Sequence, residues 1–155
     1  MSFRISGLDP APFRPLFDLT DAELAAQGGR RTLADRPVGF PDRVSLADAA
    51  VGDRLLLVNY VYQPAATPYR GTHAIYVNES AEVAFDAIDT VPPVFRTRLL
   101  SLRAFDADHM MIDADVVEGP EVEGLIERLF ENDRALYLQA HFARPGCFAA
   151  RIDRA

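Results

Sequence analysis

Hydrophobic and polar residues repeat along this chain with the periods of strands and of helices. Residues 54–62, "RLLLVNYVY", are apolar on both faces, which predicts an interior strand covered on two sides. We expect residues 72–78, "THAIYVN", to pair with this strand across the nine-residue connection 63–71. Further strands are predicted at 98–105, 109–117, 135–142 and 147–152, and the last two form a hairpin.

Two segments carry the signals of helices. Thr20 and Glu23 form a capping box, and a pair of glycines ends the helix that begins there. In the stretch 119–132, "GPEVEGLIERLFEN", Pro120 suits a first helical turn. Residues 30–44 are punctuated by Pro and Gly and are interpreted mostly as loop. Apolar residues recur on one side of the second helix, at Val122, Leu125, Ile126, Leu129 and Phe130.

Together these elements predict a single α+β domain. The chain has 155 residues, which suffices for one hydrophobic core and is short for two. The helix in 119–132 is long enough to be a crossover, so we expect strands 109–117 and 135–142 to run parallel. The predicted fold is a mixed, mostly antiparallel sheet with a C-terminal β-α-β-β unit and helices packed mainly on one face.

The stretch 106–115, "DADHMMIDAD", raises the question of a metal site. If residues 106–108 form a tight loop, Asp113 and Asp115 share the face away from the core, about 7 Å apart. Two carboxylates at this spacing suit a hard cation, provided that another strand helps to hold it. Because the strand pattern continues through them, we favour a solvated or ion-paired face, with Arg103 near enough to pair. No resident metal or other cofactor is expected.

Cys147 is the only cysteine, and two rules of register disagree about its surroundings. Pro-Gly favours a type II turn, which pairs Arg144 with Cys147 and puts His141 on the opposite face. The apolar pattern instead pairs Phe142 with Phe148 and puts His141 and Cys147 on one face, and we expect this register. Arg144 and His141 would then favour the thiolate, which makes Cys147 and His141 the candidate catalytic residues. The alternative is a small buried apolar side chain.

The connection 63–71 and the strand after it carry a candidate binding site. Tyr69, Arg70 and His73 bring an aromatic ring, a cation and a titratable ring to one loop of a hairpin, a common place for ligand binding. Arg70, or Arg144 elsewhere, would suit a carboxylate or phosphate group. The alternative is an ordered Pro-rich loop whose arginine pairs with a carboxylate. The chain contains none of the common phosphate-loop or hydrolase motifs.

Charge and composition narrow the classes of partner. The formal net charge is −7, and every fixed cation is Arg. A negative field repels nucleic acid and anionic lipid, so neither nucleic acid nor a membrane is expected as a partner. A single cysteine and an N-terminus without an apolar segment are typical of a cytoplasmic protein.

Three functions fit these observations. We favour the binding of a small anionic molecule in a pocket beside the sheet, with or without catalysis. The first alternative is a protein-interaction or regulatory module that has no pocket. The second is a divalent-metal hydrolase that uses Asp113, Asp115 and a histidine. The oligomeric state does not follow from the sequence.

Four stretches also match a known pattern in order and spacing, namely "GFPDRVSLADA", "PYRGTHAIYV", "RLLSLRAFDADHMMIDADVV" and "RPGCFAARIDRA". Over essentially its whole length the chain resembles a bacterial family of domains of unknown function, family 1203. Members of that family often carry Cys at the position of Asp42, so the resemblance does not support a two-thiol site here. It implies a compact bacterial, cytoplasmic protein and no particular activity.

Overall fold

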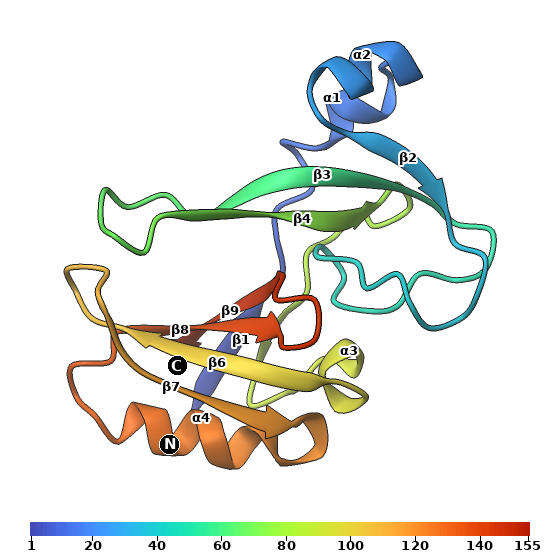
Figure 1. Ribbon diagram of the computed structural model, residues 1–155. Coiled ribbons are helices and arrows are strands. Elements are labelled where there is room, and N and C mark those ends of the chain that lie inside the picture. Colours follow the sequence, from blue (N-terminus) through green and yellow to red (C-terminus); the bar gives the residue numbers. More distant parts are fainter.

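The computed structural model describes residues 1–155 and contains two separate sheets (Figure 1). The strands are β1 (Phe3–Ser6), β2 (Arg30–Leu33), β3 (Arg54–Gln63), β4 (Gly71–Asn78), β5 (Asp86–Ile88), β6 (Leu99–Phe105), β7 (Met111–Glu118), β8 (Tyr137–Phe142) and β9 (Phe148–Arg154). The helices are α1 (Arg14–Phe17), α2 (Asp21–Ala26), α3 (Pro93–Arg96) and α4 (Val122–Phe130). The smaller sheet, drawn above the larger one, has the order β2-β3-β4, and the larger has the order β5-β1-β9-β8-β6-β7.

The smaller sheet is built on β3, and the pairing of β3 with β4 confirms the predicted hairpin. Leu55 packs on one face against the loop that follows β2, whereas Leu56 and Val58 pack on the other with residues around α1 and α2. The first half of β3 is therefore covered on both faces, as predicted. The stretch 30–44 is mostly irregular, as predicted, but its first four residues pair with β3 and form β2. Arg31 of this strand donates to the Asp21 carboxylate (2.6 Å).

Helices α2 and α4 confirm both helix predictions. At α2, Glu23 N–H donates to Thr20 Oγ1 (3.2 Å), and Thr20 N–H donates to the Glu23 carboxylate (2.7 Å), which completes the capping box. Helix α4 follows the 3-10 turn Gly119–Glu121 and buries its apolar stripe against the larger sheet. In Figure 1, α4 lies below this sheet, on the face away from the smaller sheet, so the main core lies between α4 and the larger sheet.

Strands β7 and β8 run in the same direction, as expected, but they are not neighbours. Strand β6 lies between them and pairs antiparallel with both. The reason is that β6 already forms a hairpin with β7, so only its other edge is free to accept β8 after the crossover. The one parallel contact in the protein is an isolated bridge between Asp42 and Tyr76, at the outer edge of β4. Because β4 is the edge strand of the smaller sheet, this bridge does not connect the two sheets.

The β6–β7 hairpin has a different register from the one predicted. Its loop is longer than three residues, because Asp106 Oδ1 accepts hydrogen bonds from Asp108 N–H (3.1 Å) and Met110 N–H (3.0 Å). As a result Asp113 and Asp115 lie opposite the inward-facing residues of β6, on the side of α4, and not on the far face. Most of this edge strand is exposed, so its apolar pattern is weak and the turn sets the register.

Candidate functional site

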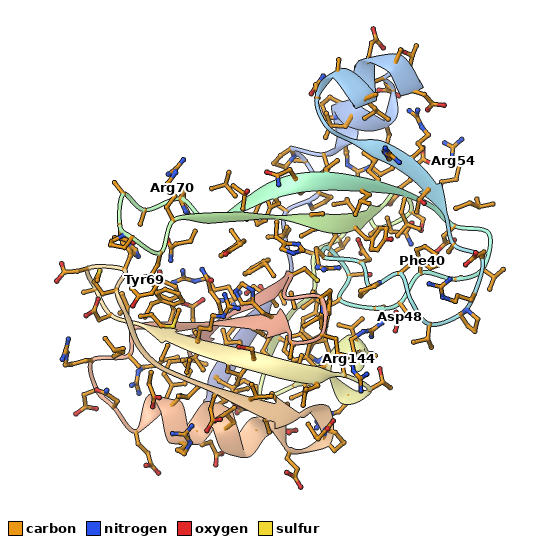
Figure 2. All side chains as sticks on the ribbon, viewed as in Figure 1. Phe40, Asp48, Arg54, Tyr69, Arg70 and Arg144 are labelled. Carbon is orange, nitrogen blue, oxygen red and sulfur yellow. The ribbon has the colours of Figure 1, made fainter.

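A cleft of about 450 Å³ opens between the two sheets, where the β8–β9 loop meets the loop before β3. Clefts of this size are typical of small-molecule sites. Figure 2 shows Arg144 at this end of the molecule, on the same side as Phe40 and Asp48. The charged, titratable or nucleophilic side chains in its lining include Arg43, His73, Tyr76, Arg98, Glu118, Arg144 and Cys147.

Residues 41–45 position the innermost cation of the cleft. Asp42 is 1% exposed, and its carboxylate accepts hydrogen bonds from Ser45 N–H (2.6 Å) and Asn78 N–H (2.8 Å). The next residue, Arg43, donates its backbone N–H to Tyr76 O (3.1 Å). These bonds hold the segment against β4, so the Arg43 side chain extends between the two sheets.

Arg43 is a buried cation without a carboxylate partner. Its side chain, in a residue 1% exposed, donates from Nε to Phe148 O (2.6 Å), from Nη1 to Pro41 O and from Nη2 to Cys147 Sγ (3.0 Å). The guanidinium carbon lies 4.9 Å from the centre of the Phe142 ring. Burial lowers the pKa of Arg43, and a negative charge on Cys147 or Asp42 opposes that change. The two carbonyls fix the position of the guanidinium but carry no net charge, and the nearby Asp42 carboxylate is hydrogen-bonded to Ser45 and Asn78.

Two further arginines reach the cleft, and they differ in pairing. Arg98 forms a two-fold ion pair with the Asp48 carboxylate, at 2.6 and 3.0 Å, and lies over the Phe142 ring. Arg144 is exposed on the β8–β9 loop and makes no hydrogen bond or ion pair with the rest of the protein. Its guanidinium is therefore available to a ligand.

The closing hairpin adopts neither of the two predicted registers over its whole length. The apolar register holds where Leu138 pairs with Ile152, but a bulge follows, and His141 then pairs with Phe148. Phe142 N–H donates to Cys147 O (2.9 Å), so these two residues lie side by side in the lining of the cleft. The expectation that His141 shares a face with Cys147 was wrong, because the extra residue of the bulge reverses the facing of the strand end.

His141 belongs to a buried polar region and not to the cleft. It is fully buried, with Nδ1 3.3 Å from Gly146 O and Nε2 3.2 Å from Gln139 Oε1. Its ring meets the ring of Tyr62 edge-on at 4.9 Å. Burial, reinforced by the positive charge of Arg103, lowers the pKa of His141 to about 3. His141 is thus neutral near pH 7 and has a structural role.

Of the three residues predicted for a binding site in and after the β3–β4 loop, only one lines the cleft. Arg70 donates to the backbone carbonyl of Pro64, and the Tyr69 ring packs edge-on against Phe105 at 6.1 Å. Figure 2 shows both residues on the opposite side of the molecule from Arg144. His73, on β4, does line the cleft. Arg70 therefore fits neither prediction, because its guanidinium binds a carbonyl and neither lines the cleft nor pairs with a carboxylate.

Asp113 and Asp115 are paired with a cation of the protein itself. Arg128, on α4, lies 3.5 Å from the Asp113 carboxylate and 2.8 Å from that of Asp115. The sequence pointed to Arg103 as the partner, and the change of register explains the difference. No cluster of three or more His, Cys, Asp or Glu side chains in the protein is arranged to hold a metal ion.

Sequence reasoning missed Arg43, Arg98 and Asp48. One signal was present for Arg43, because the charged pair "DR" lies between the apolar residues Phe40 and Val44 in a stretch interpreted as loop. Charged residues enclosed by apolar ones in a loop indicate burial with hydrogen-bond partners. No local signal joins Arg98 to Asp48, since fifty residues separate them.

A family model described as "Protein of unknown function (DUF1203)" matches residues 39–154. The chain belongs to the DUF1203 family. Gly39, at the start of the matched range, is also the first residue of the cleft lining, and Cys147 is the last, so the whole cleft of this DUF1203 protein lies inside the match. Comparisons with curated proteins and with solved structures gave no match. None of the helices has both the length and the apolar composition needed to span a membrane.

Proposed function

We propose that this DUF1203 protein binds a small molecule that carries a carboxylate or phosphate group, in the cleft between its two sheets. One observation carries the proposal: a buried guanidinium with no carboxylate partner, Arg43, and an unpaired exposed one, Arg144, line the same cleft. The chain as a whole has a net charge of −7, so carboxylates outnumber arginines. Two arginines without a carboxylate partner in one cleft therefore depart from the charge of the protein as a whole. Such a site favours an anion by charge and by the planar hydrogen-bonding edge of arginine.

The rest of the lining suits the non-ionic part of such a ligand. Leu57, Tyr76 and Phe142 supply apolar and aromatic surface, and His73 and Glu118 add polar groups. Small-molecule sites commonly combine a mostly apolar wall with a few polar groups that fix orientation. We therefore infer an acid with an apolar or aromatic part, and not a bare inorganic ion, as the preferred ligand.

We also infer that the protein acts in the cytoplasm of bacteria. Its single cysteine is a free thiol in the cleft wall, a form that a reducing compartment preserves. Fractionation of cells that express the tagged full-length chain tests this inference. Recovery in the membrane or secreted fraction would contradict it.

Thermal unfolding in the presence of small acids tests the binding proposal. The panel contains phosphate, short mono- and dicarboxylates, aromatic acids and phosphate esters, at one ionic strength. A ligand at 100 times its dissociation constant stabilises the folded state by about 2.7 kcal/mol, which raises the melting temperature by about 5–10 °C for a chain of this size. We expect at least one acid to give such a rise.

Two variants make the test specific. Arg144→Ala removes the free guanidinium and is expected to abolish the rise. Arg70→Ala, an exposed arginine outside the cleft, is the matched control and is expected to retain it. Equal stabilisation of both variants, or no stabilisation by any acid in the panel, would overturn the proposal.

A further inference from the structure

The structure places the thiol of Cys147 against a buried cation at the wall of a cleft. Cys147 Sγ accepts a hydrogen bond from Arg43 Nη2 at 3.0 Å, and both residues line the cleft. Cys147 is 7% exposed and Arg43 is 1% exposed, so both groups are shielded from solvent. A guanidinium beside a sulfur stabilises the thiolate, which is the nucleophilic form of cysteine.

The second, independent observation is the charge balance of Arg43. Its two oxygen acceptors, Phe148 O and Pro41 O, are neutral carbonyls that hold the guanidinium in place. The adjacent carboxylate of Asp42 is directed elsewhere, to Ser45 and Asn78, and Arg43 forms no ion pair. A buried cation is stabilised by an anion close by. The Asp42 carboxylate acts on Arg43 without contacting it, whereas the Cys147 sulfur is the one group hydrogen-bonded to the guanidinium that is able to carry a negative charge.

We propose that Cys147 is a thiolate with Arg43 as its counter-ion, and that the cleft uses it to attack small acids that carry an electrophilic carbon. This inference deepens the proposed function and rests on it for the acidic group, which Arg144 would hold. In the reaction a sulfur lone pair forms the new C–S bond, and the leaving group departs with the electrons of the bond it breaks. The thiol proton has already passed to solvent, so no oxidant or further base is needed.

Several charged groups surround the sulfur and set its response to pH. The cations act in favour of the thiolate, whereas the carboxylates act against it. The charged and titratable groups come from five segments around the cleft, namely the loop before β3, β4, the residue before β6, the end of β7 and the β8–β9 loop. They are Asp42, Arg43, His73, Tyr76, Arg98, Glu118 and Arg144.

Alkylation by a matched pair of reagents tests the inference. Iodoacetamide is neutral and iodoacetate carries a carboxylate, and both transfer a carbon to sulfur with loss of iodide. Because Cys147 is the only cysteine, the mass of the intact protein reports the extent of reaction. An ordinary thiol loses nearly 100-fold in rate between about pH 8 and pH 6 as its thiolate disappears. We expect the iodoacetamide rate at Cys147 to change by less than about threefold.

The anionic reagent then connects the thiolate with the proposed ligand site. The quantity compared is the rate with iodoacetate divided by the rate with iodoacetamide. We expect this ratio to be about tenfold or more higher for Cys147 than for glutathione. Arg144→Ala should remove this preference and leave the flat pH profile, while Arg70→Ala should change neither.

The outcomes separate the two proposals. A fall of about 100-fold in the iodoacetamide rate between pH 8 and 6 would overturn the thiolate, as would no reaction of the native protein when the unfolded protein reacts fully. A flat pH profile supports the thiolate whatever iodoacetate does. A flat profile without any preference for iodoacetate, unchanged in Arg144→Ala, would count against the anionic ligand site alone.

Discussion

Two polar regions lie between the sheets, and they differ in what their side chains bind. In the first, which we call the polar seam, Gln63 Nε2 donates to Tyr137 OH (2.9 Å), His109 Nδ1 lies 2.9 Å from the same hydroxyl, and His141 contacts Gln139. Every polar side chain of the seam has a hydrogen-bond partner inside the protein. None of them is an arginine, so none carries a fixed charge. The seam consists of Gln63, His109, Tyr137, Gln139 and His141.

The cleft differs from the seam in charge and in pairing. Of its three arginines only Arg98 has a carboxylate partner, Asp48. Arg43 is held by carbonyls and a thiol, and Arg144 is free. Polar groups that satisfy one another indicate a structural role, whereas cations that lack an internal anion indicate a place for an external one. This difference separates the catalytic candidates of the sequence, since His141 belongs to the seam and Cys147 to the cleft.

Removing Arg43 should have the largest effect on stability. In Arg43→Met the carbonyls of Phe148 and Pro41 lose their donors while buried, and each such loss costs about 1–3 kcal/mol. We expect the free energy of unfolding in urea to fall by about 3 kcal/mol. Arg144→Met, on the exposed loop, should stay within about 0.5 kcal/mol of the wild type. If Arg43→Met is as stable as the wild type, the hydrogen bonds of Arg43 to the buried carbonyls do not stabilise the packing of the two sheets.

Burial of His141 in the seam should make the free energy of unfolding depend on pH. The pKa of His141 is lowered to about 3 in the folded protein, whereas histidine titrates near 6.5 in an unfolded chain. Between these values only the unfolded chain binds the proton, so the free energy of unfolding falls as the pH drops below 6.5. The slope reaches about 1.4 kcal/mol per pH unit and ends near pH 3.

Variants at two histidines isolate this contribution. His141→Gln should remove it, so that urea unfolding at about pH 7, 6 and 5 gives a flatter dependence than in the wild type. His73→Gln, in the cleft lining, removes only a minor cause of the shift at His141 and should retain most of the wild-type slope. Identical slopes in all three proteins would mean that His141 is not held neutral by burial.

The smallest effect is expected at the surface pair on β7. Arg128→Ala removes the partner of Asp113 and Asp115, but all three side chains are about half exposed. Such pairs contribute less than about 1 kcal/mol, and salt weakens them. Urea unfolding at low and high salt should therefore show a small loss that vanishes in high salt. If the free energy of unfolding falls by more than about 2 kcal/mol, these ion pairs contribute as buried ones do, and the prediction is wrong.

The sequence predicted those parts of the fold that have a strong local signal. The apolar stripe of α4, the capping box at Thr20 and the doubly apolar β3 all appear where expected. Registers failed where two signals competed. On β7 the turn at Asp106 outweighed a weak apolar pattern. In the last hairpin the apolar register holds as far as the Ala140–Ala150 pair, and a bulge then shifts the pairing to His141–Phe148, which neither signal predicted. Sheet order does not follow from the sequence, because it depends on which strand edge is free, and no single segment encodes this.

The candidate site was predicted in part. Arg144, Cys147 and His73 were named from their chemistry and do line one cleft, whereas Tyr69 and Arg70 lie on another side of the molecule. Arg43 reaches the site because Asp42 holds the long loop before β3 against β4, through a hydrogen bond from Asn78 N–H. This contact joins residues that are distant in sequence. Local patterns supply the residue types of a site, but tertiary packing decides which of them meet.

The most direct test of the central claim is to map where an anion binds. Inorganic phosphate would be titrated into ¹⁵N-labelled protein against chloride at constant ionic strength, while backbone and arginine side-chain resonances are followed. We predict saturable shifts at Arg43, Arg98, Arg144 and Cys147, and none at the seam residues Gln63, His109 and Tyr137. Shifts that spread evenly over the surface arginines, or that centre on the seam, would contradict the account.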